Sequence, residues 1–309
     1  MANSSIQRKH VDLRLPGTIV PPLTPFTADQ KVDFDLLKKM VDYVVEDCDA
    51  SLVVAGGVEA QEYHFLDLEE RKELVAKTIE FVGGRRPVAV GVSHPSIRRV
   101  LELADFAQSK GADALQLLAP LRASGGTLRQ SEMVAYFEAV LNGTELPMML
   151  YLNPGPGADL TPAAVVELSK LDGIEWVKES SRDLNRLSRL MFEIEHAGHA
   201  KYFTTMQVSL ATMTLGGTGV TVPPPAALIV RKIINAFEAN DMAEASRLQQ
   251  QLALFPIQWM EFGLATVMKA AMNHLGVPMG TAYPPFEPIG GAPLDRLKAH
   301  VDTMDLNKK

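Results

Sequence analysis

The amino-acid sequence predicts an α/β fold: a (β/α)8 TIM barrel with a C-terminal helical appendage. Short apolar segments alternate with amphipathic helical segments about eight times, at intervals of about 25 residues, which is the pattern of such a barrel. Beyond Pro225 the pattern becomes wholly helical. The alternative is an open doubly wound sheet, which should carry a glycine-rich phosphate loop after its first strand. Pro21-Pro22-Leu23-Thr24 stands there instead, so the barrel is favoured.

Each predicted strand is an apolar run bounded by glycine, proline or polar residues. These runs are 17–21, 51–55, 87–91, 113–118, 146–151, 174–178, 201–204 and 219–222. Helical spacing of apolar residues predicts the connecting helices at 35–46, 68–82, 96–110, 131–141, 162–170 and 183–195, and further helices at 227–239, 242–254, 261–275 and 294–303. The chain thus divides into a loose N-terminal arm (1–16), a barrel core (17–225), and the last barrel helix with the appendage (226–309).

Composition limits the classes of function. The chain has 309 residues, of which 47% are hydrophobic and 22% charged, with a net charge of −7. The acidic balance and the lack of a basic patch argue against a nucleic-acid partner. Cys48 is the single cysteine, which excludes an intrachain disulfide and a thiolate metal cage. We expect no metal and no cofactor, because neither a ligand cluster nor a dinucleotide fingerprint appears.

The N-terminus and the apolar runs bear on localisation. Residues 1–10 are polar and lack the apolar core of a signal peptide. No apolar run reaches the roughly 18 residues that a membrane span needs. We therefore expect a cytoplasmic protein with no membrane partner.

Lys178 is the first candidate catalytic residue. It stands where a short apolar strand, 174–178, meets a polar loop. Partial burial there disfavours the ammonium form and lowers the pKa of a lysine, and the neutral amine is the form that attacks a carbonyl to give a Schiff base. The alternative is a lysine that extends to solvent and pairs with a carboxylate such as Glu179.

Tyr151 strengthens the catalytic interpretation of Lys178. It closes the preceding strand, and the helix predicted at 162–170 connects the two strands. In a parallel sheet both side chains then lie at the carboxyl edge, where α/β proteins build their sites. The pair is the only constellation in the sequence that suggests a mechanism.

The chain resembles the dihydrodipicolinate synthase and N-acetylneuraminate lyase family of class I, Schiff-base aldolases. The segments that carry the resemblance are Thr24-Pro25-Phe26 with Asp33, Glu69-Glu70-Arg71, Gly84-Arg85-Arg86-Pro87-Val88, Gly111-Ala112-Asp113, Tyr151 with Pro154, Val177-Lys178-Glu179-Ser180, Lys269-Ala270-Ala271 and Pro284-Pro285-Phe286-Glu287-Pro288. The resemblance implies a barrel, an imine on Lys178 and an acid/base role for Tyr151. It also implies a 2-oxo acid substrate, usually pyruvate, and a homotetramer.

The sequence departs from the family at the substrate-binding loops. The family's Gly-Thr-Thr-Gly-Glu is replaced by 56–62, so Gly57 and Val58 take the threonine positions when the loop is aligned at Gly56. Alignment at Glu62 places Glu59 and Ala60 there, and neither choice keeps a hydroxyl.

Three further positions depart from the synthase or the wider family. Arg122 stands where the synthase has an inter-subunit tyrosine, and the synthase's aldehyde-binding arginine falls on Pro156. Thr221 stands near the substrate, where the family often has an aliphatic residue. We therefore expect the chain not to be the lysine-pathway synthase.

These observations predict a Schiff-base lyase, an aldolase or a dehydratase, that acts on a 2-oxo acid such as pyruvate or a keto-sugar acid. Lys178 and Tyr151 are the candidate catalytic residues, and the candidate substrate-binding residues are Gly57, Val58, Arg122 and Thr221. Arg122 can hold a carboxylate with two hydrogen bonds, or can form a surface or inter-subunit ion pair. The alternatives are an authentic dihydrodipicolinate synthase and a non-catalytic ligand-binding barrel that kept the lysine.

Overall fold

Eight parallel strands form a closed barrel, as predicted. The structure is a computed structural model, and it describes residues 6–57, 62–122, 126 and 128–306. Strand order follows the sequence, and β1 pairs with β8 to close the barrel. The strands are β1 (Gly17–Val20), β2 (Leu52–Ala55), β3 (Val88–Gly91), β4 (Ala114–Leu118), β5 (Met148–Leu152), β6 (Ile174–Glu179), β7 (Lys201–Thr205) and β8 (Gly219–Thr221).

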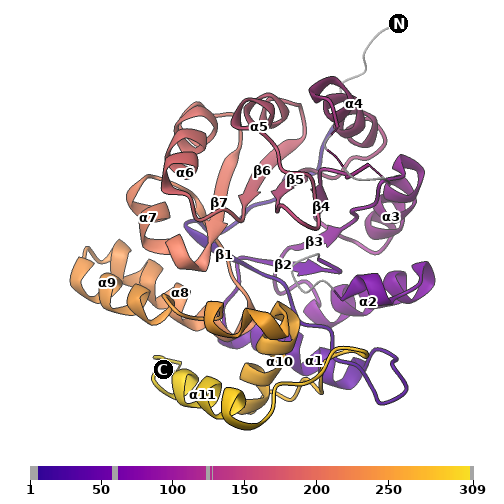
Figure 1. Cartoon of the computed structure of the whole chain (residues 1–309). Coiled ribbons are helices and arrows are strands. Elements are labelled where there is room, and N and C mark those ends of the chain that lie inside the picture. Colours follow the sequence, from indigo (N-terminus) through magenta and orange to yellow (C-terminus); the bar gives the residue numbers. More distant parts are fainter. Residues whose placement is uncertain (1–5, 58–61, 123–125, 127, 307–309) are drawn as a thin grey trace, which may run out of the picture.

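Helices surround the barrel and continue into the C-terminal appendage (Figure 1). They are α1 (Phe34–Asp42), α2 (Leu68–Val82), α3 (Ile97–Ser109), α4 (Gln130–Leu141), α5 (Pro162–Ser169), α6 (Leu184–Leu190), α7 (Ser209–Thr214), α8 (Pro224–Glu238), α9 (Met242–Gln251), α10 (Leu264–His274) and α11 (Gly291–Asp302). Helix α7 is not among the predicted helices, because its six residues are too few to establish a helical period. A 3-10 helix, η6 (Ile257–Phe262), opens the segment predicted as one helix at 261–275.

The barrel interior is filled by every second residue of its strands. Ile19, Met149, Trp176 and Phe203 belong to one buried cluster that the barrel encloses. Because side chains alternate between the two faces of a strand, the residues two positions further along point inward as well. The inward face of β5 therefore carries Met149 and then Tyr151 at its carboxyl end.

The described part of the N-terminal arm is bound to the barrel, which corrects the expectation of a loose segment. The Arg8 guanidinium donates hydrogen bonds to the carbonyl oxygens of Leu141 and Thr144, near the amino end of β5, at 3.2 and 3.1 Å. Leu13 is buried against the inward-facing cluster. The segment forms no helix or strand, so no periodicity in the sequence announces this packing.

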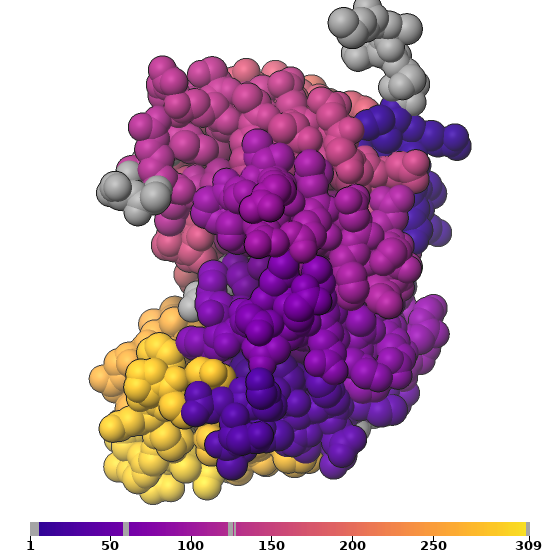
Figure 2. Space-filling view, turned by 90° about the vertical axis from the view of Figure 1, so that its right-hand side faces the viewer, coloured from indigo at the N-terminus to yellow at the C-terminus, as the bar shows by residue number. Residues whose placement is uncertain are grey.

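The C-terminal appendage is joined to the barrel by a buried ion pair. Lys269 of α10 lies 2.5 Å from Glu62, which follows β2 and also accepts a hydrogen bond from the backbone of Thr24. Burial raises the pKa of the Glu62 carboxyl and lowers the pKa of the Lys269 amine, and each partner's charge opposes the shift. On the surface, the yellow C-terminal region borders indigo residues in the lower part of the view (Figure 2).

This pair generates a stability prediction. Lys269→Met should lower the free energy of unfolding by about 3–5 kcal/mol, because it leaves the Glu62 carboxylate buried without a counter-charge. The double variant Glu62→Gln/Lys269→Met should recover most of that loss, because the glutamine amide is neutral and still accepts the hydrogen bond from the Thr24 backbone. Urea unfolding at a fixed protein concentration measures both. An equal loss in the single and double variants would assign the effect to packing rather than to charge.

Candidate active site

Tyr151 and Lys178 lie next to each other at the carboxyl end of the barrel. They are register partners on β5 and β6, and both side chains point inward as continuations of Met149 and Trp176. The Lys178 Nζ lies 3.6 Å from the centroid of the Tyr151 ring, and each residue is 3% exposed. The predicted pair is therefore brought together at the edge where barrel enzymes hold their sites.

The Tyr151 hydroxyl lies within reach of two polar side chains from the same two strand ends. The Asn153 amide donates a hydrogen bond to the Tyr151 oxygen at 2.9 Å. The Ser180 hydroxyl also faces that oxygen, at 3.4 Å, a longer and weaker contact. These neighbours hold the phenol oxygen on the cavity side of the barrel mouth.

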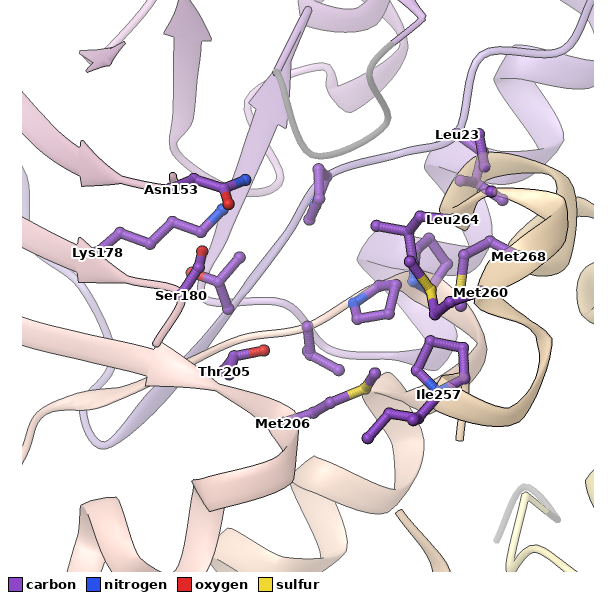
Figure 3. Close-up of a pocket in the computed structure, with 18 of the residues that line it drawn as sticks. Leu23, Asn153, Lys178, Ser180, Thr205, Met206, Ile257, Met260, Leu264 and Met268 are labelled. Carbon is purple, nitrogen blue, oxygen red and sulfur yellow. The ribbon is translucent and has the colours of Figure 1, made fainter. Parts of the chain in front are cut away.

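A cavity of about 600 Å³ opens directly over this pair. Its polar groups come from the carboxyl ends of four neighbouring strands and the loops after them: Tyr151, Asn153, Lys178, Ser180, Arg182, Thr205 and Thr221. Figure 3 shows Asn153, Lys178, Ser180 and Thr205 on one side of it. The opposite side is lined by apolar residues of the appendage, so the cavity has a polar and an apolar end.

Thr221, a candidate substrate-binding residue, lines this cavity. It ends β8, and its side chain contributes to the lining. Its hydroxyl oxygen is buried and forms no hydrogen bond with any of the described residues. A buried hydroxyl without a partner costs free energy, so a hydrogen bond formed by this group would be favourable.

The other predicted binding residues are placed elsewhere or lie outside the described residues. Val58 lies outside the described residues. Gly57 lines a small cavity beside Tyr63, separate from the one over Lys178. Arg122 forms an ion pair with Glu132 at 2.7 Å and is 47% exposed, and it does not line the Lys178 cavity. Its position matches the surface ion pair that was the alternative to a carboxylate fork.

Glu132 is shared between two guanidinium groups. Hydrogen bonds from Arg129 and, after it, from Arg122 lower the pKa of Glu132 to about 2. The carboxylate is therefore charged at neutral pH and keeps Arg122 engaged at the start of α4. In the single chain, Arg122 therefore belongs to a surface ion pair and not to the barrel mouth.

Glu179, the alternative partner of Lys178, is engaged on the outer face of β6. It accepts hydrogen bonds from the Arg186 guanidinium at 2.8 Å and from the Ser181 backbone. Adjacent residues of a strand point to opposite faces, so Glu179 points away from the cavity that Lys178 faces. The ion pair between Glu179 and Arg186 fixes the loop between β6 and α6.

Sequence reasoning missed Arg182 and the apolar side of the cavity. Arg182 lies in the loop after β6, four residues beyond Lys178, and lines the cavity. It is exposed, and none of the described carboxylates forms an ion pair with it. Its place just beyond a strand end was a usable signal, because such loops build the sites of barrels. The apolar side comes from residues about 80 positions further along the chain, which no local pattern connects to Lys178.

Two features of the described residues bear on other functions. No group of three or more histidine, cysteine, aspartate or glutamate side chains is arranged to hold a metal ion. No helix there combines the length and apolar character needed to cross a bilayer.

Comparison with known proteins gives one consistent result. The model of the dihydrodipicolinate synthetase family matches residues 14–304. The 4-hydroxy-tetrahydrodipicolinate synthase of Oceanobacillus iheyensis is 26% identical over 290 residues, 93% of this chain and 96% of the relative. YagE, a prophage protein of the dihydrodipicolinic acid synthase family from E. coli K12 solved in complex with pyruvate, has a TM-score of 0.85 at 26% identity, covering 94% of this chain and 99% of that one.

A second structural likeness shows the fold alone. N-acetylneuraminate lyase from Mycoplasma synoviae has a TM-score of 0.81 at 22% identity, and the match covers 94% of this chain and 98% of that chain.

Proposed function

The chain belongs to the dihydrodipicolinate synthetase family, and we propose that it is a class I lyase that binds a 2-oxo acid as an imine on Lys178. The observation that carries this proposal is the Lys178–Tyr151 pair at the base of one cavity. The complex of YagE with pyruvate supports a 2-oxo acid as the ligand class. The family's synthases and lyases support lyase chemistry.

The proposed chemistry begins at the substrate carbonyl. The Lys178 amine attacks C2 of the oxo acid, and the carbinolamine loses water to give an iminium ion. For cleavage, the iminium ion accepts the electron pair of the bond between C3 and C4, which releases an aldehyde, and the remaining enamine takes up a proton at C3. For dehydration, a base removes a proton from C3, and the resulting enamine expels the hydroxyl group at C4, which leaves as water after protonation. In both cases water hydrolyses the final iminium ion and returns Lys178 to the free amine.

Tyr151 is proposed to move the protons in these steps. Its ring lies beside the Lys178 amine, and a positioned acid/base group of this kind protonates the departing water and accepts a proton from the C4 hydroxyl group. The Asn153 amide would stabilise the phenolate that forms when Tyr151 gives up its proton. Asn153 and Ser180 would thus supply the polar groups near Tyr151 that the threonine pair supplies in other members of the family.

Arg182 is proposed to bind the substrate carboxylate, together with the Thr221 hydroxyl. Both line the Lys178 cavity, and a guanidinium offers two parallel hydrogen bonds to a carboxylate. Arg122, the residue first considered for this role, is engaged with Glu132 outside that cavity. Gly57 lines a separate cavity, and neither Gly57 nor Val58 carries a polar side-chain group, so neither is assigned to the carboxylate.

The authentic synthase is the second candidate, because the similar curated relative has that activity by name. Two placements argue against it. Pro156, at the position of the synthase's aldehyde-binding arginine, lines a different cavity from Lys178, and Arg122 is engaged with Glu132. A coupled assay with pyruvate and aspartate semialdehyde separates this candidate from the proposal. A third candidate, a ligand-binding barrel without turnover, shares the imine but not the proton transfers.

A homotetramer remains the expected assembly by resemblance. Three large apolar side chains on α6, on α9 and directly after α7 are exposed in the single chain and would be covered by a neighbouring subunit: Leu184, Met242 and Leu215.

Borohydride trapping tests the imine. Reduction in the presence of pyruvate should add the mass of one reduced adduct to the protein and place it on the peptide that contains Lys178. Lys178→Ala should abolish the adduct. Lys269, the other deeply buried lysine, pairs with Glu62 and should stay unmodified. An adduct that forms at an unchanged rate in Lys178→Ala would show that another amine is the nucleophile.

Tyr151→Phe tests the acid/base role. The variant should exchange the methyl protons of pyruvate for deuterium about 10²–10⁴-fold more slowly, because enamine formation needs a positioned proton carrier. The pyruvate concentration for half-maximal trapping should change little. Tyr202→Phe is a matched control, since its buried hydroxyl has no partner among the described residues. Proton exchange at the wild-type rate in Tyr151→Phe would remove the phenol from the mechanism.

Arg182→Gln tests the carboxylate site. Loss of a charge-assisted hydrogen bond should raise the pyruvate concentration for half-maximal trapping by about tenfold to a hundredfold. Capture of methyl pyruvate, which lacks the charge, should change much less. Arg122→Gln is the control and should behave as wild type. A larger effect of Arg122→Gln than of Arg182→Gln would contradict this assignment. It would show that Arg122 binds the carboxylate and reaches the cavity in the assembled protein.

A further inference from the structure

The cavity over Lys178 has an apolar wall that the proposed chemistry does not use. Four residues from η6 and α10 form it: Ile257, Met260, Leu264 and Met268. Figure 3 shows them together on the side opposite Lys178 and Asn153. Met206, Leu23 and Val222 extend the same surface. A carbonyl and a carboxylate need only the polar end, so the wall faces the rest of the substrate.

Helical geometry places these side chains side by side. Residues three apart eclipse each other in a 3-10 helix, so Ile257 and Met260 of η6 share one face. Residues four apart share a face of an α-helix, which aligns Leu264 with Met268 on α10. Gly263 joins the two elements at φ 81°, a conformation that other residues rarely adopt, and turns both faces toward the cavity.

The wall is partly wet without a ligand. Ile257 is 51% exposed and Met260 is 44% exposed, while Met268 beneath them is buried. A hydroxyl-rich substrate chain would lose hydrogen bonds with water against such a surface and gain none, which is unfavourable. An alkyl or aryl chain would remove both surfaces from water, which is favourable.

We propose that the chain acts on 2-oxo acids whose far end is apolar, an alkyl or aryl group that packs on Ile257, Met260, Leu264 and Met268. This inference rests on the proposed function. In the cleavage direction, a 4-hydroxy-2-oxo acid yields pyruvate and an apolar aldehyde. The C3–C4 bond breaks, the proton of the C4 hydroxyl leaves to the base, C3 gains a proton, and no oxidant or reductant is consumed.

The experiment measures borohydride trapping against a series of 2-oxo acids: pyruvate, 2-oxobutanoate, 2-oxohexanoate, 2-oxo-4-phenylbutanoate and the hydroxylated 2-keto-3-deoxygluconate. The half-saturating concentration should fall about fourfold for each methylene that is buried on the wall. The phenyl compound should be captured well, and the hydroxylated compound should be captured more weakly than 2-oxohexanoate, which has the same number of carbons.

A matched pair of variants assigns the effect to the wall. Ile257→Asn should raise the half-saturating concentration of 2-oxohexanoate about tenfold and leave that of pyruvate within about twofold. Leu254→Asn is the control, because Leu254 is 50% exposed, close in sequence, and outside the lining of the cavity. Met260→Gln, on the wall, and Met242→Gln, outside the cavity lining, form a second pair of variant and control, since each methionine is 44% exposed.

The outcomes separate this inference from the proposed function. Trapping of pyruvate on Lys178 with no preference for apolar chains overturns the inference and leaves the lyase proposal intact. A change of oligomer size in Ile257→Asn without a change of selectivity assigns the wall to a subunit contact and also overturns it. Absence of trapping with every acid overturns the proposed function itself.

Discussion

The closed ring of parallel strands is the constraint on which the site depends. Pairing of β1 with β8 completes the ring, and glycines at Gly17 and Gly219 allow the two backbones to approach. A Cβ added at Gly219 would meet the backbone oxygen of Gly17 at 2.2 Å. Because all the strands run the same way, their carboxyl ends share one mouth. Tyr151, Lys178 and Thr221, which are far apart in sequence, meet there for that reason alone.

The parts of the site that were predictable are those that a strand positions. Strand alternation determines that Tyr151 and Lys178 face inward, and the order of parallel strands makes them neighbours, so local pattern and fold class were enough. No comparable rule determines where a side chain on a loop points. Arg122 and Arg182 both follow strands, and only the surroundings decide between them: Glu132 engages Arg122, while none of the described carboxylates pairs with Arg182. The apolar wall was out of reach because it belongs to helices that return to the barrel late in the chain.

The appendage contributes to the site through one polar and one apolar face of α10. Lys269 anchors the helix to Glu62, and Met268, the preceding residue, lines the cavity. Separation of Glu62 from Lys269 would leave a buried charge without its partner, so the helix has little freedom to move away from the barrel. The position of the wall relative to Lys178 is therefore set by an interaction outside the cavity.

The distribution of polar groups suggests how chemistry and selectivity divide within the fold. In the proposed function, the barrel supplies Lys178, Tyr151 and their neighbours, which would act on the atoms common to all 2-oxo acids. The appendage would supply the surfaces that contact the parts in which these acids differ. A hydrophobic pocket discriminates by only about 1–3 kcal/mol per methylene, whereas the loss of a needed hydrogen bond discriminates far more strongly. Recognition of the oxo-acid end should thus be strict, while the apolar end should accept a graded family of chains, with preference that follows buried area rather than one defined shape.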